Sequence, residues 1–504
     1  MSSDLPPGEP DLLEERDRLL QRPDLTGAGG RSARGIVWNV GANGLGFVLR
    51  LGSIPILARL LSPEDYGLVA MVTAVTGFIG VVGVMGVGEL VIQKQVLTHR
   101  QATLMFWATS AVGLLLMGLT VVASPLVALL FGRPELTLIA IAVSSTFVIS
   151  GVGVVHRALM MRRLQHRSVA VRELVAMASG LVASVGAALI GAGYWALVIQ
   201  MVVQATVTTV LCLIAVPWRP GLPRRGSQVR EMASFGSGVS VFKIVNYLGQ
   251  NADNLVIGYF LNASALGVYT RAYGLLTAPL QQIHTPVGYV ITPTLASLWS
   301  DPERYRKYFL TVLAGLCYVC MPLVLVLAVL ADQVVAIMLG DQWLEAAEVF
   351  RWLAIVGFLQ TVAWTNGWLY ASSGQAWRWA RWGLISRPII IASFLVGVSW
   401  GIEGVAIAFA IAELFLAPIG IYRAGQGTPV SLRQVLRAIA HPVVLAFTMA
   451  ATALAVTLQV DASPLVDVLV TVAAAGVVGA ALVLLWPATR REVFGMVGTL
   501  RSRG

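Results

Sequence analysis

Apolar residues occur along this chain in long runs that are separated by short polar stretches. A helix that crosses the hydrocarbon core of a bilayer needs about 20 predominantly apolar residues. The runs therefore predict an all-α polytopic membrane protein with about 14 transmembrane helices. The predicted spans are 35–60, 65–92, 103–131, 136–160, 168–190, 193–216, 232–261, 264–297, 308–331, 346–372, 379–400, 402–423, 435–459 and 464–486. The short apolar run 334–339 after Asp332 is a candidate for a separate interfacial piece.

The basic residues concentrate in every second loop and in the two tails. These regions hold 29 of the 35 lysines and arginines, including Arg378, Arg381 and Arg387, which were assigned to one loop. The alternate loops are short and acidic or neutral, as at 62–65 and 262–264. Because cytosolic loops of membrane proteins are enriched in Lys and Arg, both termini are predicted to be cytosolic.

Composition supports this class. The chain is 57% hydrophobic and 12% charged, and its mean hydropathy is +0.78. The net charge of +10 follows from the loop pattern and from contact with anionic lipid headgroups, so no nucleic-acid partner is expected. Cys317 and Cys320 have no nearby His or Cys, which favours helix packing over a metal or redox site. No cofactor is expected, and the polar first thirty residues do not resemble a cleavable signal peptide.

Two pairs of segments indicate that the membrane domain is duplicated. Residues 56–68 align without gaps on 256–268, at an offset of 200. Residues 191–197 align on 401–407, at an offset of 210. Duplicated halves around a central site are a recurring plan of transporters.

The repeats and the linker composition predict six parts. These are a cytosolic polar tail (1–30), an N-lobe of six helices (31–216), a cytosolic linker (217–230), a C-lobe of six helices (231–424), two accessory helices (425–490) and a cytosolic tail (491–504). The accessory helices have no counterpart in the repeat.

Polar side chains form a stripe in each half, on the first and seventh predicted spans. A charge at the centre of a membrane helix costs about 2.5–3.5 kcal/mol on insertion scales, so such residues usually face a wet cavity. Arg50 and Lys243 lie too deep in their spans to reach the headgroups, and Arg271 is intermediate in depth. The candidate substrate-binding residues are Arg50, Lys243, Arg271, Asn39, Asn43, Asn246 and Gln250.

Asp253 lies on the same stripe as Lys243 and is the best candidate for a coupling-ion site. A buried carboxylate must be paired, protonated or bound to a cation. Na⁺ or H⁺ coupling and a structural ion pair both remain open, and Glu89 and Glu413 are weaker candidates. Tyr247 and Trp364 are expected to pack, with stacking on sugars as the alternative.

Residues 59–67 (RLLSPEDYG) resemble a segment of polysaccharide and O-antigen flippases, and 253–258 followed by 265–269 and 272–273 resemble its second-half counterpart. These Wzx-type flippases belong to the multidrug/oligosaccharidyl-lipid/polysaccharide exporter superfamily. The resemblance implies two six-helix lobes around a central cavity. It also implies a monomeric carrier that moves an undecaprenyl-pyrophosphate-linked oligosaccharide across the cytoplasmic (inner) membrane by alternating access. Such a carrier would serve exopolysaccharide or O-antigen assembly beside a polysaccharide polymerase and export machinery.

Three alternatives were weighed. A multidrug exporter of the same fold is disfavoured by two deep cations, because exporters of organic cations would favour carboxylates. A lipid II exporter is resembled less by the local motifs. A membrane polysaccharide polymerase or glycosyltransferase needs a large outer domain, and the predicted outer loops are too short for one.

Overall fold

The computed structural model describes residues 28–83, 87–94, 96–222, 247, 249–460 and 463–486; for 28–40, 42, 43 and 81–83 only the backbone is described. Over these ranges the chain is helical and contains no strand. The chain separates into two compact units, Met1–Leu248 and Gly249–Gly504. The boundaries of the six parts expected from the sequence stay predictions, because most of the linker 217–230 lies outside the described ranges.

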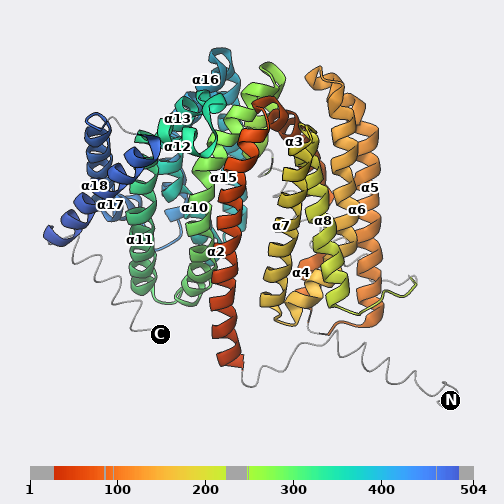
Figure 1. Ribbon diagram of the computed structural model, residues 1–504. Coiled ribbons are helices and arrows are strands. Elements are labelled where there is room, and N and C mark those ends of the chain that lie inside the picture. Colours follow the sequence, from red (N-terminus) through yellow and green to blue (C-terminus); the bar gives the residue numbers. More distant parts are fainter. Residues whose placement is uncertain are drawn as a thin grey trace. The chain divides into compact units, whose positions relative to one another are not determined.

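The first unit is a bundle of long helices (Figure 1). Its helices are α2 (Ala28–Leu60), α3 (Pro63–Gly83), α4 (Val87–Gln93), α5 (His99–Phe131), α6 (Glu135–Arg162), α7 (His166–Leu189) and α8 (Trp195–Ala215). Helix α6 packs against α3, α4, α5 and α8, and α7 packs against α2 and α8.

The second unit begins with a helical segment over 249–260. It continues with α10 (Ala263–Ser297), α11 (Pro302–Val329), α12 (Ala331–Met338), the short helix η1 (Asp341–Trp343), α13 (Glu345–Ala363), α14 (Asn366–Ser372), α15 (Ala376–Gly397), η2 (Val398–Trp400), α16 (Gly401–Gly425), α17 (Leu432–Thr457) and α18 (Pro464–Leu485). Helix α13 packs against α10, α11 and α16, and α15 packs against α16. The hairpin of α17 and α18 packs on this unit mainly through α11 and α12.

The two units share one packing scheme. The pairs α3–α6, α5–α6, α6–α8 and α7–α8 of the first unit correspond in chain order to α10–α13, α11–α13, α13–α16 and α15–α16 of the second. The hairpin α17–α18 has no counterpart in the first unit. This arrangement agrees with two repeated lobes and two additional helices.

The first pair of repeated segments, 56–68 and 256–268, forms equivalent junctions between two helices. Helix α2 ends at Leu60 and α3 begins at Pro63, while the segment 249–260 ends and α10 begins at Ala263. The side chain of Ser62 accepts a hydrogen bond from the Asp65 backbone N–H (3.2 Å), and Asn262 accepts one from that of Ala265 (2.8 Å). Both residues therefore satisfy a free N–H group at a helix start, which is the usual role of an N-cap residue.

The second repeat junction uses two equivalent glycines. Gly191 has φ of 78° and Gly401 has φ of 77°. Side chains other than glycine are strained in this left-handed region. The two residues lie 210 positions apart and precede or open α8 and α16, as the sequence alignment predicts.

Two predicted spans differ in outline from the helices. The tenth span divides into α13 and α14, whereas residues 84–86 between α3 and α4 of the second span lie outside the described ranges. Near the break in the tenth span, the hydroxyls of Thr361 and Thr365 donate to the carbonyls of Gly357 (3.0 Å) and Val362 (2.7 Å), and such bonds often bend helices. Helix α2 begins at Ala28, inside the region expected to be a tail. The separate short piece expected around 334–339 is present as α12, and its interfacial location stays a prediction.

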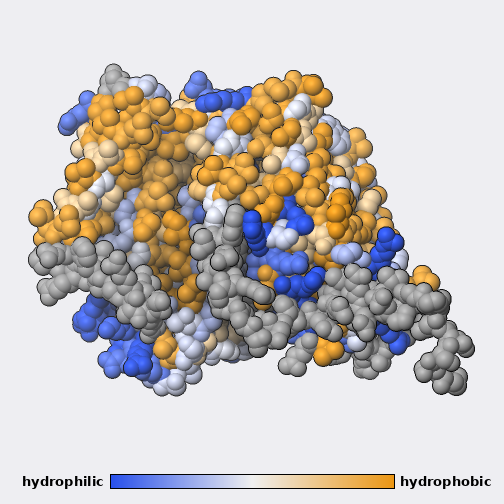
Figure 2. Space-filling view, turned by 60° about the horizontal axis from the view of Figure 1, so that its bottom comes forward, coloured by the Kyte–Doolittle hydropathy of each residue, from blue (hydrophilic) through white to orange (hydrophobic). Residues whose placement is uncertain are grey.

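The described helices include nine segments long and apolar enough to cross a membrane. Two of these, Glu345–Ser372 and Ala376–Gly425, each contain two α-helices. In the face shown in Figure 2, hydrophobic residues cover long tracts of the helices and hydrophilic residues form smaller patches. The chain is thus an all-helical, multi-pass membrane protein, and the total of fourteen spans stays a prediction.

The first residues of the predicted linker are docked on the first unit. Trp218 is 2% exposed, and its indole N–H donates to Nδ1 of His99 (3.0 Å). His156 Nε2 lies 3.1 Å from the Trp218 carbonyl oxygen. Trp107 donates to the carbonyl of Gly221 (2.9 Å). The chain therefore stays attached to α5 and α6 as far as Gly221.

Candidate functional site

The polar stripe of the first half lies on α2. Asn39 and Asn43 belong to this helix, but their side chains lie outside the described part of the structure. Arg50 is exposed and lies ten residues before the end of α2, a distance of about 15 Å along the helix. Its carbonyl accepts a hydrogen bond from Ser53 Oγ (2.7 Å). Among the described residues, no acidic side chain forms an ion pair with the Arg50 guanidinium.

The stripe of the second half is only partly described. Lys243 and Asn246 lie outside the described residues. Gln250 is exposed on the segment 249–260, and Arg271 is half-buried on α10. Both side chains remain candidates for contact with a polar cargo.

Asp253 is buried, with 4% of its surface exposed. Its Oδ1 accepts a hydrogen bond from the backbone N–H of Asn254 (2.8 Å). The carboxylate also lies within interaction range of Tyr269 on α10. Within the part of the chain that the structure describes, Asp253 has no basic ion-pair partner, and the buried Tyr269 hydroxyl forms no well-aligned hydrogen bond. The structural ion pair that the sequence left open as an alternative therefore has no basic partner among these residues.

Further buried polar residues lie beyond Asp253 in the same unit. Tyr273, one turn beyond Tyr269, interacts with Asp253 and with Gln360 on α13. Gln360 also lies within range of Glu413 on α16, and these two residues are 7% and 8% exposed. The buried Oε1 of Gln360 has no hydrogen-bond donor among the described residues. Buried acceptors without a donor are costly, so this cluster is suited to bind a proton or a cation.

Arg387 is the site residue that the sequence analysis missed. It was assigned to a cytosolic loop, but it lies half-buried on α15, eleven residues after the helix starts at Ala376. It interacts with Glu413, and its side chain crosses Gly249 so closely that a Cβ there would overlap it. Arg387 therefore belongs to the interior of the second unit, where it lies against the backbone of the segment 249–260 at Gly249. The sequence did contain one indication of this buried position, because Arg387 lies inside the predicted span 379–400.

The aromatic candidates serve packing. The Tyr247 hydroxyl lies 3.1 Å from the carbonyl oxygens of Thr73 and Ala74 and donates to this pair. Gly77 leaves the space for the Tyr247 ring, because a Cβ at this position would overlap the hydroxyl. Gly77 thus allows the Tyr247 ring to approach the backbone of α3 closely.

Trp364 packs against His284, with ring centroids 5.3 Å apart. His284 also stacks on Trp368, with centroids 4.7 Å apart and planes inclined by 17°. The three rings form one cluster that joins α10 to the break between α13 and α14. His284 therefore serves packing in this environment.

The two weaker carboxylate candidates differ in environment. Glu413 is buried and is balanced by Arg387. Glu89 is exposed and lines a cavity of about 540 Å³ within the first unit, together with Arg157. Arg157 is paired with Glu173 at 2.6 Å. Asp253 is thus the one of the three that combines deep burial with no described cationic partner.

Comparisons with known proteins identify the family. The model of a family described as "polysaccharide biosynthesis protein" matches residues 56–348. Lipopolysaccharide biosynthesis protein WzxC of Escherichia coli (strain K12) is 22% identical over 391 residues, which cover 76% of this chain and 79% of that protein. Succinoglycan biosynthesis transport protein ExoT of Rhizobium meliloti (strain 1021) is 29% identical over 324 residues, or 64% of this chain and 65% of that protein.

Solved structures with the same fold are also found. The lipid II flippase MurJ in an inward closed conformation matches with a TM-score of 0.67 and 12% identity, covering 89% of this chain and 98% of that one. An inward-facing multidrug transporter of the MATE family and MOP superfamily matches with a TM-score of 0.59 and 14% identity, covering 78% and 94%. At these identities the likeness concerns the fold alone. With more than half of its length matched by the family model, the chain belongs to the polysaccharide biosynthesis protein family.

Proposed function

We propose that this protein is a flippase that moves an undecaprenyl-pyrophosphate-linked oligosaccharide across the cytoplasmic membrane by alternating access. The observation that carries the proposal is Arg50, an exposed cation without a described ion-pair partner, about 15 Å inside a helix of a polysaccharide-biosynthesis family member. Its relatives' names and the flippase and transporter folds of its structural neighbours support a transporter rather than an enzyme.

The chemistry of such a cargo explains why the carrier needs polar residues in its spans. The headgroup is anionic and strongly hydrated, and polar groups lose their hydrogen bonds with water when they enter hydrocarbon. Arginine binds phosphate oxygens through several N–H donors in a fixed geometry. A cation that keeps its donors available inside a span can therefore replace part of the water around a pyrophosphate.

Each polar residue has a proposed role in this scheme. Arg50, Lys243 and Arg271 bind the phosphates. Amide side chains bind sugar hydroxyls, and these are Asn39, Asn43, Asn246 and Gln250. Arg387, which lies near Gln250 through its contact with Gly249, is a further cation for the headgroup when it is not held by Glu413.

Asp253 is the proposed coupling site for H⁺ or Na⁺. Its burial, the absence of a described basic partner and the nearby acceptors that lack donors support this role. Oxygen ligands such as carboxylate, amide and hydroxyl groups suit hard cations. Neutralisation of Asp253 in one conformation and release in the other would bias the equilibrium between inward- and outward-open states.

The remaining assignments follow from the topology and the cargo. The protein lies in the inner membrane with both termini in the cytosol, acts as a monomer, and passes its cargo to a polysaccharide polymerase and the export machinery. The basic loops support this orientation through the positive-inside rule.

The test is to remove the protein and identify the lipid-linked glycan that accumulates on the cytosolic side. Arg50→Ala should reach the membrane at normal levels and fail to relieve this accumulation. Arg304→Ala is the matched control, because Arg304 is an exposed cation paired with Asp301 (3.2 Å) at a helix start, and it should restore transport fully. Normal transport by Arg50→Ala, or no accumulation of any lipid-linked glycan on removal of the protein, would contradict the proposal.

A further inference from the structure

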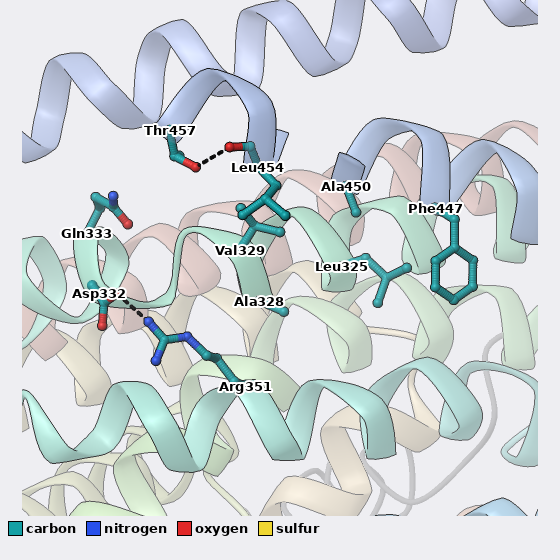
Figure 3. Close-up of a pocket in the computed structure, with 10 residues that line it drawn as sticks. All are labelled: Leu325, Ala328, Val329, Asp332, Gln333, Arg351, Phe447, Ala450, Leu454 and Thr457. Atoms are coloured by element: carbon teal, nitrogen blue, oxygen red, sulfur yellow. Dashed lines mark hydrogen bonds and ion pairs between the residues drawn. The ribbon is translucent and has the colours of Figure 1, made fainter. Parts of the chain in front are cut away.

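A second site candidate lies in a part of the protein that the proposed transport function does not use. A pocket of about 540 Å³ opens between α11, α12, α13 and α17 in the second unit (Figure 3). One wall is apolar and is formed mainly by Leu325, Val329, Phe447, Ala450 and Leu454. Phe447 and Leu454 are 58% and 51% exposed, so this wall is open to the surroundings of the helices.

One end of the pocket is polar. Arg351 Nη2 donates to Asp332 Oδ2, and the two side chains are 42% and 59% exposed. Gln333 lies beside this ion pair in Figure 3. Its Nε2 donates to Asp467 Oδ2 on α18 (2.6 Å), while its buried Oε1 has no partner among the described residues. The polar end thus offers a carboxylate and a guanidinium close together, with Gln333 beside them.

The length of the apolar wall corresponds to one leaflet. Phe447 and Thr457 mark its two ends on α17, and the ten residues between them span about 15 Å of helix. The hydrocarbon core of a bilayer is about 30 Å thick, so half of it is about 15 Å. Asp332 and Thr457 lie at the helix ends that the topology places outside.

We propose that this pocket binds a phospholipid of the outer leaflet with a zwitterionic headgroup that carries a primary amine. The headgroup lies at Asp332 and Arg351, and one acyl chain follows the wall formed by α11 and α17. This site goes beyond the transport of the lipid-linked glycan and uses none of its proposed binding residues.

Charge complementarity selects this headgroup. Asp332 and Arg351 are the charged residues of the lining, so the pocket has no net charge to favour an anionic lipid. The lipid phosphate can accept further N–H donors of Arg351, which has five donors and uses one in the ion pair. A primary ammonium can donate to the exposed carboxylate of Asp332, whereas a quaternary ammonium has no N–H to donate. Charge-assisted hydrogen bonds of this kind are the strong ones, while an exposed ion pair alone contributes little.

The experiment measures which phospholipids the full-length protein retains. The purified protein is equilibrated with phosphatidylethanolamine, phosphatidylcholine and phosphatidylglycerol of identical acyl chains, and bound lipid is counted by native mass spectrometry. The ethanolamine lipid should be retained about tenfold better than the other two, the ratio that one additional charge-assisted hydrogen bond gives. Equal retention, or preference for the glycerol lipid or for a polyprenyl lipid, would overturn the proposal.

Variants locate the binding within the pocket. Asp332→Asn and Arg351→Gln should abolish the preference for the ethanolamine lipid, and Ala450→Phe should reduce retention by filling the groove while keeping the ion pair. The matched control is Arg133→Gln, which breaks an ion pair of similar exposure with Glu64 (3.0 Å, 39% and 49% exposed) in the first unit, whereas the pocket lies in the second. A preference that persists in all three pocket variants contradicts the site. If the polar variants do not fold, Ala450→Phe and the ranking of headgroups by the unmodified protein decide.

Discussion

The substitution Asp253→Asn separates the coupling role of this carboxylate from a structural one. Asparagine keeps the shape of the side chain and can still accept the hydrogen bond from the Asn254 N–H, which is 2.8 Å from Oδ1. It removes the charge that must be neutralised within the membrane. Asp253 lies seven residues before the segment 249–260 ends, about 10 Å from its outer end.

The expected size of the effect on the conformational equilibrium follows from the free-energy cost of a charge in the membrane. A bare carboxylate near the centre of a membrane helix costs about 2.5–3.5 kcal/mol on insertion scales. Since about 1.4 kcal/mol corresponds to a factor of ten, neutralisation of Asp253 can change a conformational ratio by about 60- to 300-fold. A factor of about 100 moves a two-state equilibrium from 1:10 to 10:1. A proton or Na⁺ bound in one conformation is thus sufficient to drive the cycle.

The assay is transport of a lipid-linked oligosaccharide in proteoliposomes under an imposed pH or Na⁺ gradient. We expect Asp253→Asn to bind the cargo, to insert normally and to lose the response to either gradient. Glu413→Gln is the contrasting variant, because loss of this charge leaves the half-buried Arg387 without its described counter-charge and should lower thermal stability. The reasoning is refuted if transport by the unmodified protein ignores both gradients, or if Asp253→Asn keeps the gradient response.

Three further predictions concern the repeats and the topology. Ser62→Ala and Asn262→Ala should each lower the free energy of unfolding by about 1 kcal/mol, the usual cost of an N-cap, with Asn262→Ser close to neutral in the same thermal unfolding assay. Gly191→Ala and Gly401→Ala should each cost about 1–2 kcal/mol, since both positions have φ near the left-handed region; a neutral result at either would contradict the assigned backbone. A topology reporter fused after Ser463 should report the outside, and a cytosolic signal there would break the predicted orientation.

The sequence predicts the repeat junctions because local chemistry sets them. A residue that caps a helix and a glycine that needs a positive φ are read from their neighbours alone. Ser62, Asn262, Gly191 and Gly401 were therefore located by alignment before any packing was known. Helix α12 was also foreseen, because its apolar run is too short to span.

The sequence did not predict features that depend on packing between helices. Arg387 was counted with the cytosolic loop charges because Arg378 and Arg381 precede it closely. Its actual position inside the second unit depends on Glu413 and on the bare backbone of Gly249, which come from two other helical segments. Hydropathy along one helix contains no information about such partners.

The docked start of the linker was missed for the same reason. Residues 217–222 are rich in proline, glycine and arginine, a composition that is typical of loops. The structure holds them through Trp218, which is inserted between His99, Phe106 and His156. These three rings come from α5 and α6, more than 60 positions earlier in the chain.

The repeat also shows that two equivalent positions of the two halves differ in their environment. At the offset of 200, Arg50 corresponds to Gln250, and Ser53 corresponds to Asp253. In the first unit the cation is exposed and Ser53 bonds to the carbonyl of Arg50 (2.7 Å), so this position needs no external partner. In the second unit the amide is exposed and the carboxylate is buried without a described basic partner, so this position needs a proton or a cation. On our proposal the first copy has kept the charge that binds the cargo, and the second has gained the charge that couples its transport to an ion gradient.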